Sequence, residues 1–403
     1  MQPPWGTLTG IRPAKVAEKL IHRLGSLEAV ADTLINEYRV MPDKAALCIE
    51  TAQAALRVKE TLAPRDVALY IGIPFCPTRC AYCSFVSNSV EKSFDLMDKF
   101  TETLLQEVKT IAEIVEELDL RIIAVYFGGG TPTAIPDHSL ESIMSTLLRL
   151  FDFSNLREYT VEAGRPDTIT EANLEIMTRL GVKRICINPQ TMSENVLSAI
   201  GRKHTTGDVY NAVKLVRQTG AVLNMDIISG LPGDSLEGFQ RTLDTIIKFE
   251  PENITVHTLS LKKGSRLMLE KTDAPKGAKS NITSPAEPLE ALCGNVGEML
   301  EYASKRLRES LYSPYYVYRQ KYISGGFENT GWSLPGHEGI YNICMMEELC
   351  TVLAAGGGGV TKLVTGDGRI ERIFNAKYPL EYINMTEKIK ENAGRLRRNA
   401  ISI

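Results

Sequence analysis

Three of the chain's eight cysteines fall within eight positions, spaced as Cys76-x3-Cys80-x2-Cys83. A short apolar run, residues 67–73, leads into them and is typical of a buried strand. Two prolines in the next positions force the chain out of regular structure, so the loop after the strand can wrap three sulfurs around one centre. Three thiolates suit an iron–sulfur cluster and leave one iron of a 4Fe–4S cube open to a small molecule.

Other interpretations of these cysteines stay open. A zinc-binding scaffold would usually close with four ligands, but no fourth Cys or His follows nearby, the next histidine being His138. Disulfides are disfavoured, because the loop is too tight for neat pairing and the chain shows no secretory context. Three structural cysteines could also fall this close by chance. The spacing therefore favours a metal or cluster site.

Composition places the chain among ordinary folded proteins. Its 403 residues suffice for an α/β barrel with additions, and its 43% apolar and 24% charged residues are typical of a globular protein. The net charge of −3 gives no electrostatic case for a nucleic acid partner, and no apolar run approaches the roughly 18 residues of a membrane span. With no signal peptide and with thiols suited to a reducing compartment, we expect a cytoplasmic location.

Residues 1–66 have the pattern of a helical N-terminal extension. Apolar residues at helical spacing predict helices over 14–24, 26–38 and 43–62. The first follows a proline and ends before a glycine, as is common at helix ends. The segment before it opens abruptly, from which we expect a start inside a longer ancestral protein or a trimmed chain.

Regular alternation of apolar strands and amphipathic helices follows over residues 67–260. The predicted strands are 67–73, 121–127, 157–163, 183–188, 222–228 and 253–259. The predicted helices between them are 91–116, 137–150, 170–180, 195–200, 206–219 and 235–248. Six strands alternating with helices indicate a parallel sheet, which right-handed crossovers curl into a partial (β/α)6 barrel of the α/β class. Active sites in such folds lie at the carboxyl ends of the strands.

Glycine and polar residues occupy these predicted carboxyl ends. The second strand ends in Gly128-Gly-Gly-Thr131, where glycines let the backbone approach a ligand and leave amide groups free to bind a carboxylate or an amine. A plain glycine turn is the alternative. Glu162 closes the third strand, and a buried unpaired carboxylate is costly, so we expect a salt-bridge partner or a ligand. The later strands carry Gln190, Asp226 and His257, which completes a predicted binding site around a common axis.

Residues 261–403 change character and are expected to form a mixed α+β region that covers the substrate. A polar stretch, 271–288, is typical of a flexible connector, and a long helix is predicted over about 287–310. The glycine-rich segment 355–361 allows close backbone approach. The tail, 380–397, has the pattern of a basic surface helix.

Aromatic and basic residues mix in the segment 315–322 of this region. Tyr316 and Arg319 are substrate candidates there, because rings beside Arg suit a flat macrocycle with carboxylates and Arg pairs with a carboxylate in a fork. The alternative is an amphipathic edge strand with solvated charges. His337, between two glycines, could position a polar group over the substrate or belong to a turn.

Together these motifs resemble a known family. The cysteine loop, with Tyr82 before its third cysteine, is similar to that of the radical S-adenosylmethionine (SAM) enzymes. The motifs that resemble the oxygen-independent coproporphyrinogen III dehydrogenase group within them contain Gly128–Thr133, Glu162, Gln190, Arg202 and Asp226. Segments 8–13, 161–167 and 335–342 are most similar to the HemZ-type members. The resemblance covers nearly the whole chain.

The resemblance implies a role for each motif residue. Cys76, Cys80 and Cys83 would hold the cluster, and SAM would chelate the open iron through its amino and carboxylate groups. Tyr70 would lie near the cluster and Tyr82 near the adenine. The further implied SAM contacts are Gly129, Gly130 and Thr131 along the methionyl part, Glu162 and Arg202 at charged or ribose groups, and Gln190 and Asp226 at a second SAM molecule.

The resemblance also implies a reaction on a tetrapyrrole. One electron, from a donor such as flavodoxin or ferredoxin, would cleave the sulfonium to a 5′-deoxyadenosyl radical that takes a hydrogen from a propionate chain. Loss of carbon dioxide would convert coproporphyrinogen III to protoporphyrinogen IX in anaerobic haem biosynthesis. The decarboxylases carry a fourth cysteine two places after the third, where this chain has Phe85. That departure leaves a haem-binding or haem-delivery protein, or a radical methyltransferase acting on a tetrapyrrole or another ring, as alternatives.

Overall fold

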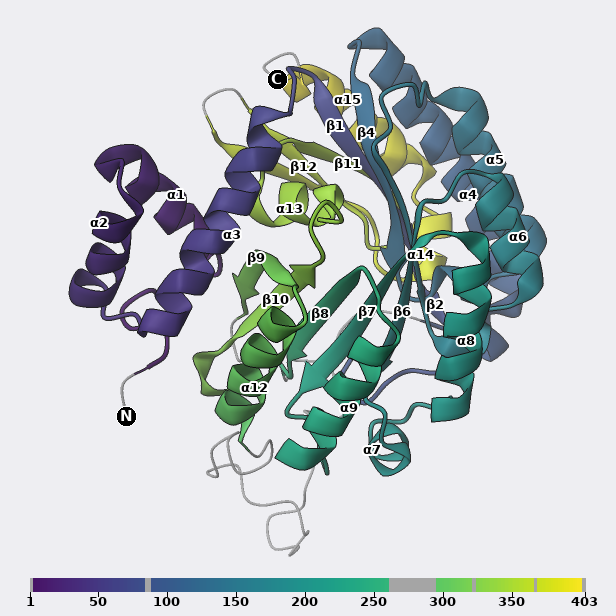
Figure 1. Cartoon of the computed structure of the whole chain (residues 1–403). Coiled ribbons are helices and arrows are strands. Elements are labelled where there is room, and N and C mark those ends of the chain that lie inside the picture. The colour runs from purple at the N-terminus through teal and green to yellow at the C-terminus, as the bar shows by residue number, and fades with distance from the viewer. Residues whose placement is uncertain (1–2, 84–87, 261–294, 321–323, 366–367, 401–403) are drawn as a thin grey trace, which may run out of the picture.

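The six apolar runs that the sequence marks as strands lie side by side in a computed structural model of the chain (Figure 1). The structure describes residues 3–83, 88–260, 295–320, 324–365 and 368–400. These strands are β1 (Asp66–Ile73), β4 (Arg121–Gly129), β5 (Glu158–Gly164), β6 (Arg184–Gln190), β7 (Val222–Ser229) and β8 (Asn253–Thr258). Each pairs in parallel with the next. The predicted partial barrel of the α/β class is confirmed.

Helices cover the outer face of this sheet (Figure 1). They are α4 (Val90–Glu117), α5 (Asp137–Leu150), α6 (Glu171–Arg179), α7 (Glu194–Ala199), α8 (Thr206–Thr219), α9 (Leu236–Lys248) and α12 (Val296–Glu309). On β1, Val67, Leu69 and Ile71 pack into the core beneath them, while Tyr70 points to the inner face. The period of two thus divides each strand into a side that packs against helices and a side that faces the barrel interior.

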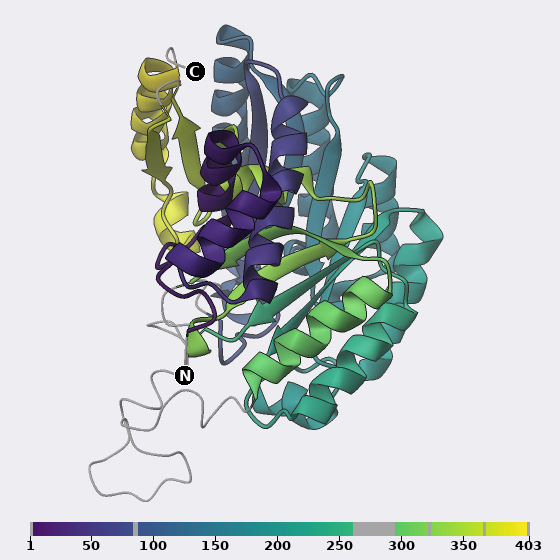
Figure 2. The same ribbon diagram turned by 60° about the vertical axis from the view of Figure 1, so that its left-hand side comes forward.

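The N-terminal extension packs against the C-terminal part of the chain. Its helices are α1 (Pro13–Leu24), α2 (Leu27–Asp32), a π-helical turn η1 (Thr33–Glu37) and α3 (Pro42–Glu60), so the predicted helix 26–38 is split in two. Figure 2 shows these purple helices beside the green C-terminal strands, and α1 and α3 contact strand β9 (Ser313–Arg319). The buried carboxylate of Glu328 accepts hydrogen bonds from Trp5 Nε1 at 2.8 Å and Lys44 Nζ at 2.7 Å. This ion pair ties the extension to the sheet.

The C-terminal region extends the same sheet at both edges. Strand β10 (Glu328–Ser333) pairs with β8, and β9 pairs with β10. Strand β11 (Thr351–Gly356) pairs in parallel with β1, followed outward by β12 (Val360–Val364) and β13 (Ile370–Phe374). The sheet is therefore continuous across the predicted boundary between 67–260 and 261–403. The predicted connector 271–288 lies outside the described residues, as does the beginning of the predicted helix 287–310, whose described part is α12.

The predicted single basic surface helix, 380–397, is wrong. The tail forms two helices, α14 (Pro379–Ile383) and α15 (Thr386–Ala400), and both pack against α4. Tyr382 is fully buried, and Ile389 and Leu396 also lie in the core. Apolar residues at helical spacing bury one face of the tail, so its basic residues cover only the other face. No helix in the described segments is both long enough and apolar enough to cross a membrane.

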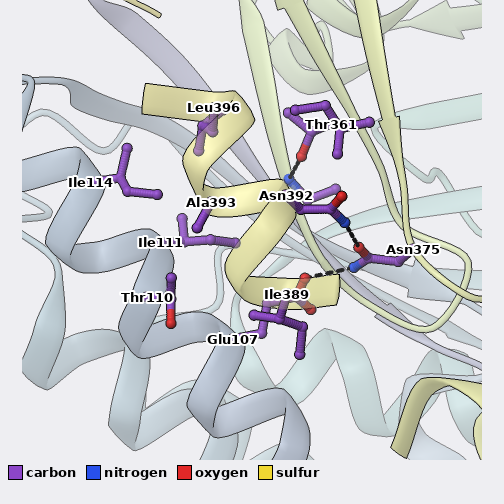
Figure 3. A pocket seen from close by; sticks show the side chains of 12 residues that line it. Glu107, Thr110, Ile111, Ile114, Thr361, Asn375, Ile389, Asn392, Ala393 and Leu396 are labelled. Carbon is purple, nitrogen blue, oxygen red and sulfur yellow. Dashed lines mark hydrogen bonds between the residues drawn. The ribbon is translucent and has the colours of Figure 1, made fainter. Parts of the chain in front are cut away.

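A small cavity of about 30 Å³ lies between α4, the edge strands and α15 (Figure 3). Its Glu107 carboxylate is 4% exposed and accepts hydrogen bonds from Asn375 Nδ2 at 2.8 Å, Gly356 N at 2.8 Å and Tyr382 Oη at 2.5 Å. Asn392 Nδ2 donates in turn to Asn375 Oδ1 at 3.4 Å. Burial raises the pKa of Glu107 and outweighs the three hydrogen-bond donors, which lower it. Glu107 therefore fastens the end of β11 to the C-terminal tail.

Replacing Glu107 by Ala should lower the free energy of unfolding by about 3 kcal/mol, because it leaves the Gly356 amide and the Tyr382 hydroxyl without an acceptor, at roughly 1–3 kcal/mol each before relaxation. Denaturant unfolding followed by circular dichroism measures the change. Glu113→Ala, at an exposed position of the same helix, is the matched control and should stay within about 0.5 kcal/mol of the unmodified chain. Equal stability of the two variants would contradict the role given to Glu107.

Candidate functional site

A cavity of about 430 Å³ opens at the carboxyl ends of the parallel strands. All the residues predicted to hold the cluster or SAM line it, namely Tyr70, Cys76, Cys80, Tyr82, Cys83, Gly129, Gly130, Thr131, Glu162, Gln190, Arg202 and Asp226. They come from different strands because the carboxyl ends of parallel strands meet at one edge of a sheet. The structure therefore brings the predicted residues together, while their individual roles stay predictions.

The cysteine loop leaves β1 and is pinned at both ends. The short strands β2 (Phe75–Cys76) and β3 (Asn88–Ser89) pair with each other across it. Thr131 Oγ1 donates a hydrogen bond to Cys76 Sγ at 3.5 Å, and Arg165 Nη1 approaches Cys80 Sγ at 3.9 Å. A hydroxyl and a guanidinium placed in this way can donate to a metal-bound sulfur, and such contacts orient metal ligands.

The glycine turn after β4 holds this loop by backbone contacts. Gly130 N donates to Ile73 O and Thr131 N donates to Phe75 O, each at 2.7 Å. A Cβ at Gly130 would lie 2.3 Å from Phe75 O, so any side chain there would collide with the backbone. The expectation that these amides are free for a ligand is therefore wrong for Gly130 and Thr131. Their donors support the cysteine loop instead.

Arg202 links the cysteine loop to the end of β6. Its side chain is buried and donates from Nη2 to Tyr82 Oη at 3.1 Å and from Nη1 to the carbonyl of Asn188. The Ala81 amide also bonds to Ile200 O at 2.9 Å, just before this arginine in the chain. The tyrosine that the sequence predicts near the adenine is thus fixed by the predicted arginine.

Glu162 has neutral partners and no salt bridge among the described residues, which leaves a ligand as the other expectation for it. Tyr126 Oη and Asn188 Nδ2 donate to its two carboxylate oxygens, the second at 2.8 Å. Burial, and next the nearby Asp226 carboxylate, raise the pKa of Glu162 to about 7. A carboxyl group with this pKa is half-ionised near neutral pH and would gain charge beside a positive ligand.

Asp226 on β7 lies beside His257 on the neighbouring strand β8. Asn224 Nδ2 donates to Asp226 Oδ1 at 2.9 Å, and His257 Nε2 lies 3.4 Å from Asp226 Oδ2. Burial lowers the pKa of His257, but Asp226 outweighs it and leaves that pKa raised. The cavity therefore contains two carboxylates and one imidazole that interact electrostatically with one another.

Known proteins share the sequence features of this site. Residues 70–246 match the family model described as the Radical SAM superfamily. Over 388 residues the chain is 39% identical to the oxygen-independent coproporphyrinogen-III oxidase-like protein HemZ of Bacillus subtilis (strain 168), which covers 94% of this chain and 74% of that protein. The chain belongs to the radical SAM superfamily. Within the superfamily it is a member of the HemZ-like family, as its motifs predict.

The radical SAM chain is also similar to one further protein in sequence and to another in structure. It is 33% identical over 193 residues to the heme chaperone HemW of Bacillus subtilis (strain 168), covering 47% of this chain and 49% of that protein. Among solved structures it resembles coproporphyrinogen III oxidase (HemN) of Escherichia coli, with a TM-score of 0.60 and 19% identity over 83% of this chain and 72% of that one. The second likeness establishes a shared fold.

The cofactors of radical SAM proteins are a 4Fe–4S cluster and SAM. The residues of this cavity fit both. Three cysteines converge on it, and thiolates are the ligands that iron–sulfur clusters require. Two buried oxygens, Asn188 Oδ1 and Gln190 Oε1, receive no hydrogen bond from the part of the chain that the structure describes, and they suit the amino and hydroxyl groups of SAM. Gln190 also adopts φ +69°, a strained conformation typical of functional sites.

The predicted substrate residues Tyr316, Arg319 and His337 do not line the cavity. Arg319 points the other way, with Nε 3.2 Å from Gly326 O and its guanidinium over the Trp5 ring, because it shares with Val317 the face of β9 that packs against the N-terminal segment. The His337 carbonyl accepts hydrogen bonds from Arg184 and Asn253 in a turn. The residues of this region that reach the cavity are instead Tyr318, Gln320, Asn329, Tyr341, Asn342, Met345 and Met346.

The glycine segment 355–361 behaves in part as expected. A Cβ at Gly356 would lie 2.2 Å from Gly72 O, and one at Gly357 would lie 2.6 Å from Pro74 Cγ. Close backbone approach is therefore confirmed, but it is made to β1 and not to the cavity. Phe85, which replaces the fourth cysteine of the decarboxylases, lies outside the described residues.

Replacing Gly130 by Ala should reduce cluster assembly by at least half, since the added methyl would collide with Phe75 O and displace the cysteine loop. Iron and sulfide per chain after anaerobic reconstitution measure the effect. Gly10→Ala is the control, because a Cβ there meets no atom within 4 Å. Full iron content in Gly130→Ala would show that the turn does not position the cysteines.

SAM binding should strengthen up to about 10-fold as the pH rises from 6 to 8, because Glu162 becomes ionised through its pKa of about 7 and SAM carries a positive sulfonium. Anaerobic calorimetric titration of the cluster-loaded protein measures this. Glu162→Gln should flatten the pH profile, while Glu171→Gln, at an exposed position, should leave it unchanged. An unchanged profile in Glu162→Gln would assign the pH dependence to another group.

Proposed function

We propose that this radical SAM chain acts on a tetrapyrrole and converts coproporphyrinogen III to protoporphyrinogen IX. The observation that carries the proposal is that one cavity holds both the three cysteines and a stack of tyrosine rings. Tyr126 and Tyr341 stack at 4.3 Å between ring centroids, and Tyr70 lies 6.2 Å from Tyr341 and 6.4 Å from Tyr126. Stacked rings offer a flat apolar surface to a macrocycle.

In this proposal the cavity residues position the cofactors and the substrate. Cys76, Cys80 and Cys83 hold the cluster, whose reaction with SAM supplies hydrogen-abstracting radical chemistry. Arg202 keeps Tyr82 in place on the SAM side, and Glu162 meets a positive or hydroxyl group of the cofactor. The remaining predicted SAM contacts have the roles that the family resemblance implies. Gln190 and Asp226 among them bind a second SAM molecule.

Each propionate conversion must balance in atoms and electrons. One hydrogen atom leaves the propionate, the bond to the carboxylate breaks to release carbon dioxide, and a vinyl group remains. One electron is left over and passes to an external one-electron acceptor. A reduced protein such as flavodoxin or ferredoxin would supply the electron that starts each cycle.

Anaerobic incubation with SAM, dithionite, a one-electron acceptor and coproporphyrinogen III tests the proposal. We expect 5′-deoxyadenosine to form together with a product lighter by one carbon dioxide and two hydrogen atoms per propionate converted, as mass spectrometry would detect. Cys76→Ala should abolish both products, whereas Cys48→Ala, a buried cysteine of α3 outside the loop, should retain them. SAM cleavage with no change in porphyrinogen mass would refute the decarboxylation.

A second candidate function is haem binding or delivery. The sequence Ser84-Phe85 after the third cysteine, in place of the decarboxylases' fourth, favours it, and so does the likeness to a heme chaperone. Haem titration of the cluster-loaded protein, followed by absorbance, would show a saturable stoichiometric complex. If haem binds in this way and coproporphyrinogen III is never converted, the second function replaces the first.

A further inference from the structure

His257 lines the cavity from a different strand than the one that leads into the cysteine loop. It is on β8, the last of the six parallel strands, whereas the cysteines follow β1. Asp226 pairs with Thr255, and Ile228 pairs with His257, so the side chains of Asp226 and His257 project from the same inner face of the sheet. The His257 side chain is 26% exposed, which leaves part of the ring open to the cavity.

The groups around His257 favour the charged form of its ring and raise its pKa. Asp226 from β7 lies 3.4 Å from Nε2, the Asn329 side chain from β10 also hydrogen-bonds to the ring, and the Glu162 carboxylate from β5 attracts its charge. Burial disfavours the charged ring, but these carboxylates outweigh it, so the pKa of His257 is raised. The imidazolium therefore persists towards neutral pH and is lost as the pH rises through this raised pKa.

The other cations that line the cavity are committed to the cysteine loop. Arg165 Nε and Nη2 bond to the two carboxylate oxygens of Asp167 at 3.0 and 3.1 Å, and Nη1 bonds to Thr78 Oγ1 at 3.0 Å. Arg202 is held by Tyr82 and the Asn188 carbonyl. Among the described residues that line the cavity, His257 is thus the remaining basic side chain.

We infer that His257 is a specificity residue that binds one carboxylate side chain of the substrate. On the proposed function, this group is a propionate of the tetrapyrrole. Ser260 Oγ, a buried hydroxyl oxygen that lines the same cavity, has no hydrogen-bond partner among the described residues and can serve the same carboxylate. The tyrosine stack then supports the ring while His257 sets which edge of the macrocycle enters the cavity.

Haem and haem dimethyl ester, titrated into the anaerobic cluster-loaded protein, test this contact directly. Esterification removes the propionate charge and keeps the ring, so the unmodified chain should bind haem about 10- to 100-fold more tightly than the diester, the range of a charge-assisted hydrogen bond. His257→Gln should weaken haem binding and bring the ratio near 1. His138→Gln, whose side chain is 74% exposed on α5, should keep the full ratio.

Two outcomes would overturn the inference: equal affinity of haem and its diester in the unmodified chain, or the same ratio in His257→Gln. A merely structural role would weaken both ligands equally and leave their ratio unchanged. The pH profile adds a second readout, since haem affinity of the unmodified chain should fall as the pH rises through the pKa of His257, and that fall should vanish in His257→Gln.

Turnover separates this inference from the proposed reaction. With coproporphyrinogen III, His257→Gln should raise KM by at least 10-fold with a smaller change in kcat, because the lost contact is made in the bound substrate as well as in the transition state. If the unmodified chain converts no porphyrinogen, the proposed decarboxylation fails, and the ratio of haem to diester still decides the role of His257.

Discussion

The position of β1 is set by neighbours that leave no space for a side chain. A Cβ at Gly130 would lie 2.3 Å from Phe75 O, and a Cβ at Gly356 would lie 2.2 Å from Gly72 O. One glycine follows β4 and the other ends β11. Close backbone contacts therefore hold β1, the strand that leads into the cysteines, on both sides. The C-terminal region is therefore part of the support of the cysteine loop, and Glu107 fastens it there through the Gly356 amide.

Burial gives the cavity its electrostatic character. Glu162 and Asp226 face each other in a setting that raises the pKa of Glu162 to about 7, while Arg202 and His257 supply positive charge from separate walls. Such groups would be unremarkable in water, where charges a few ångströms apart interact weakly. Enclosed in one cavity, they favour a ligand with both positive and negative groups, as SAM has.

Much of the fold could be predicted because its signals are local. Apolar runs of strand length alternate with amphipathic helices, and polar residues such as Glu162 and Gln190 mark the strand ends. The wrong predictions also rest on local patterns, which tertiary packing overrides. The tail was predicted as a surface helix, although Tyr382 and Leu396 bury one side of it. Arg319 was expected at the substrate, although the alternation along β9 turns it towards Trp5 and directs Tyr318 to the cavity.

The sequence by itself determined the cysteine spacing, the order of strands and helices in the barrel, and the residue types at the strand ends, because these depend on neighbours along the chain. Only the tertiary structure decided that β11 pairs with β1, that Tyr341 joins the Tyr70 stack, and that His257 lies against Asp226. Those contacts join distant segments, and their register follows from how whole elements pack. The cysteine loop could thus be predicted from its spacing, whereas these contacts between distant segments could not.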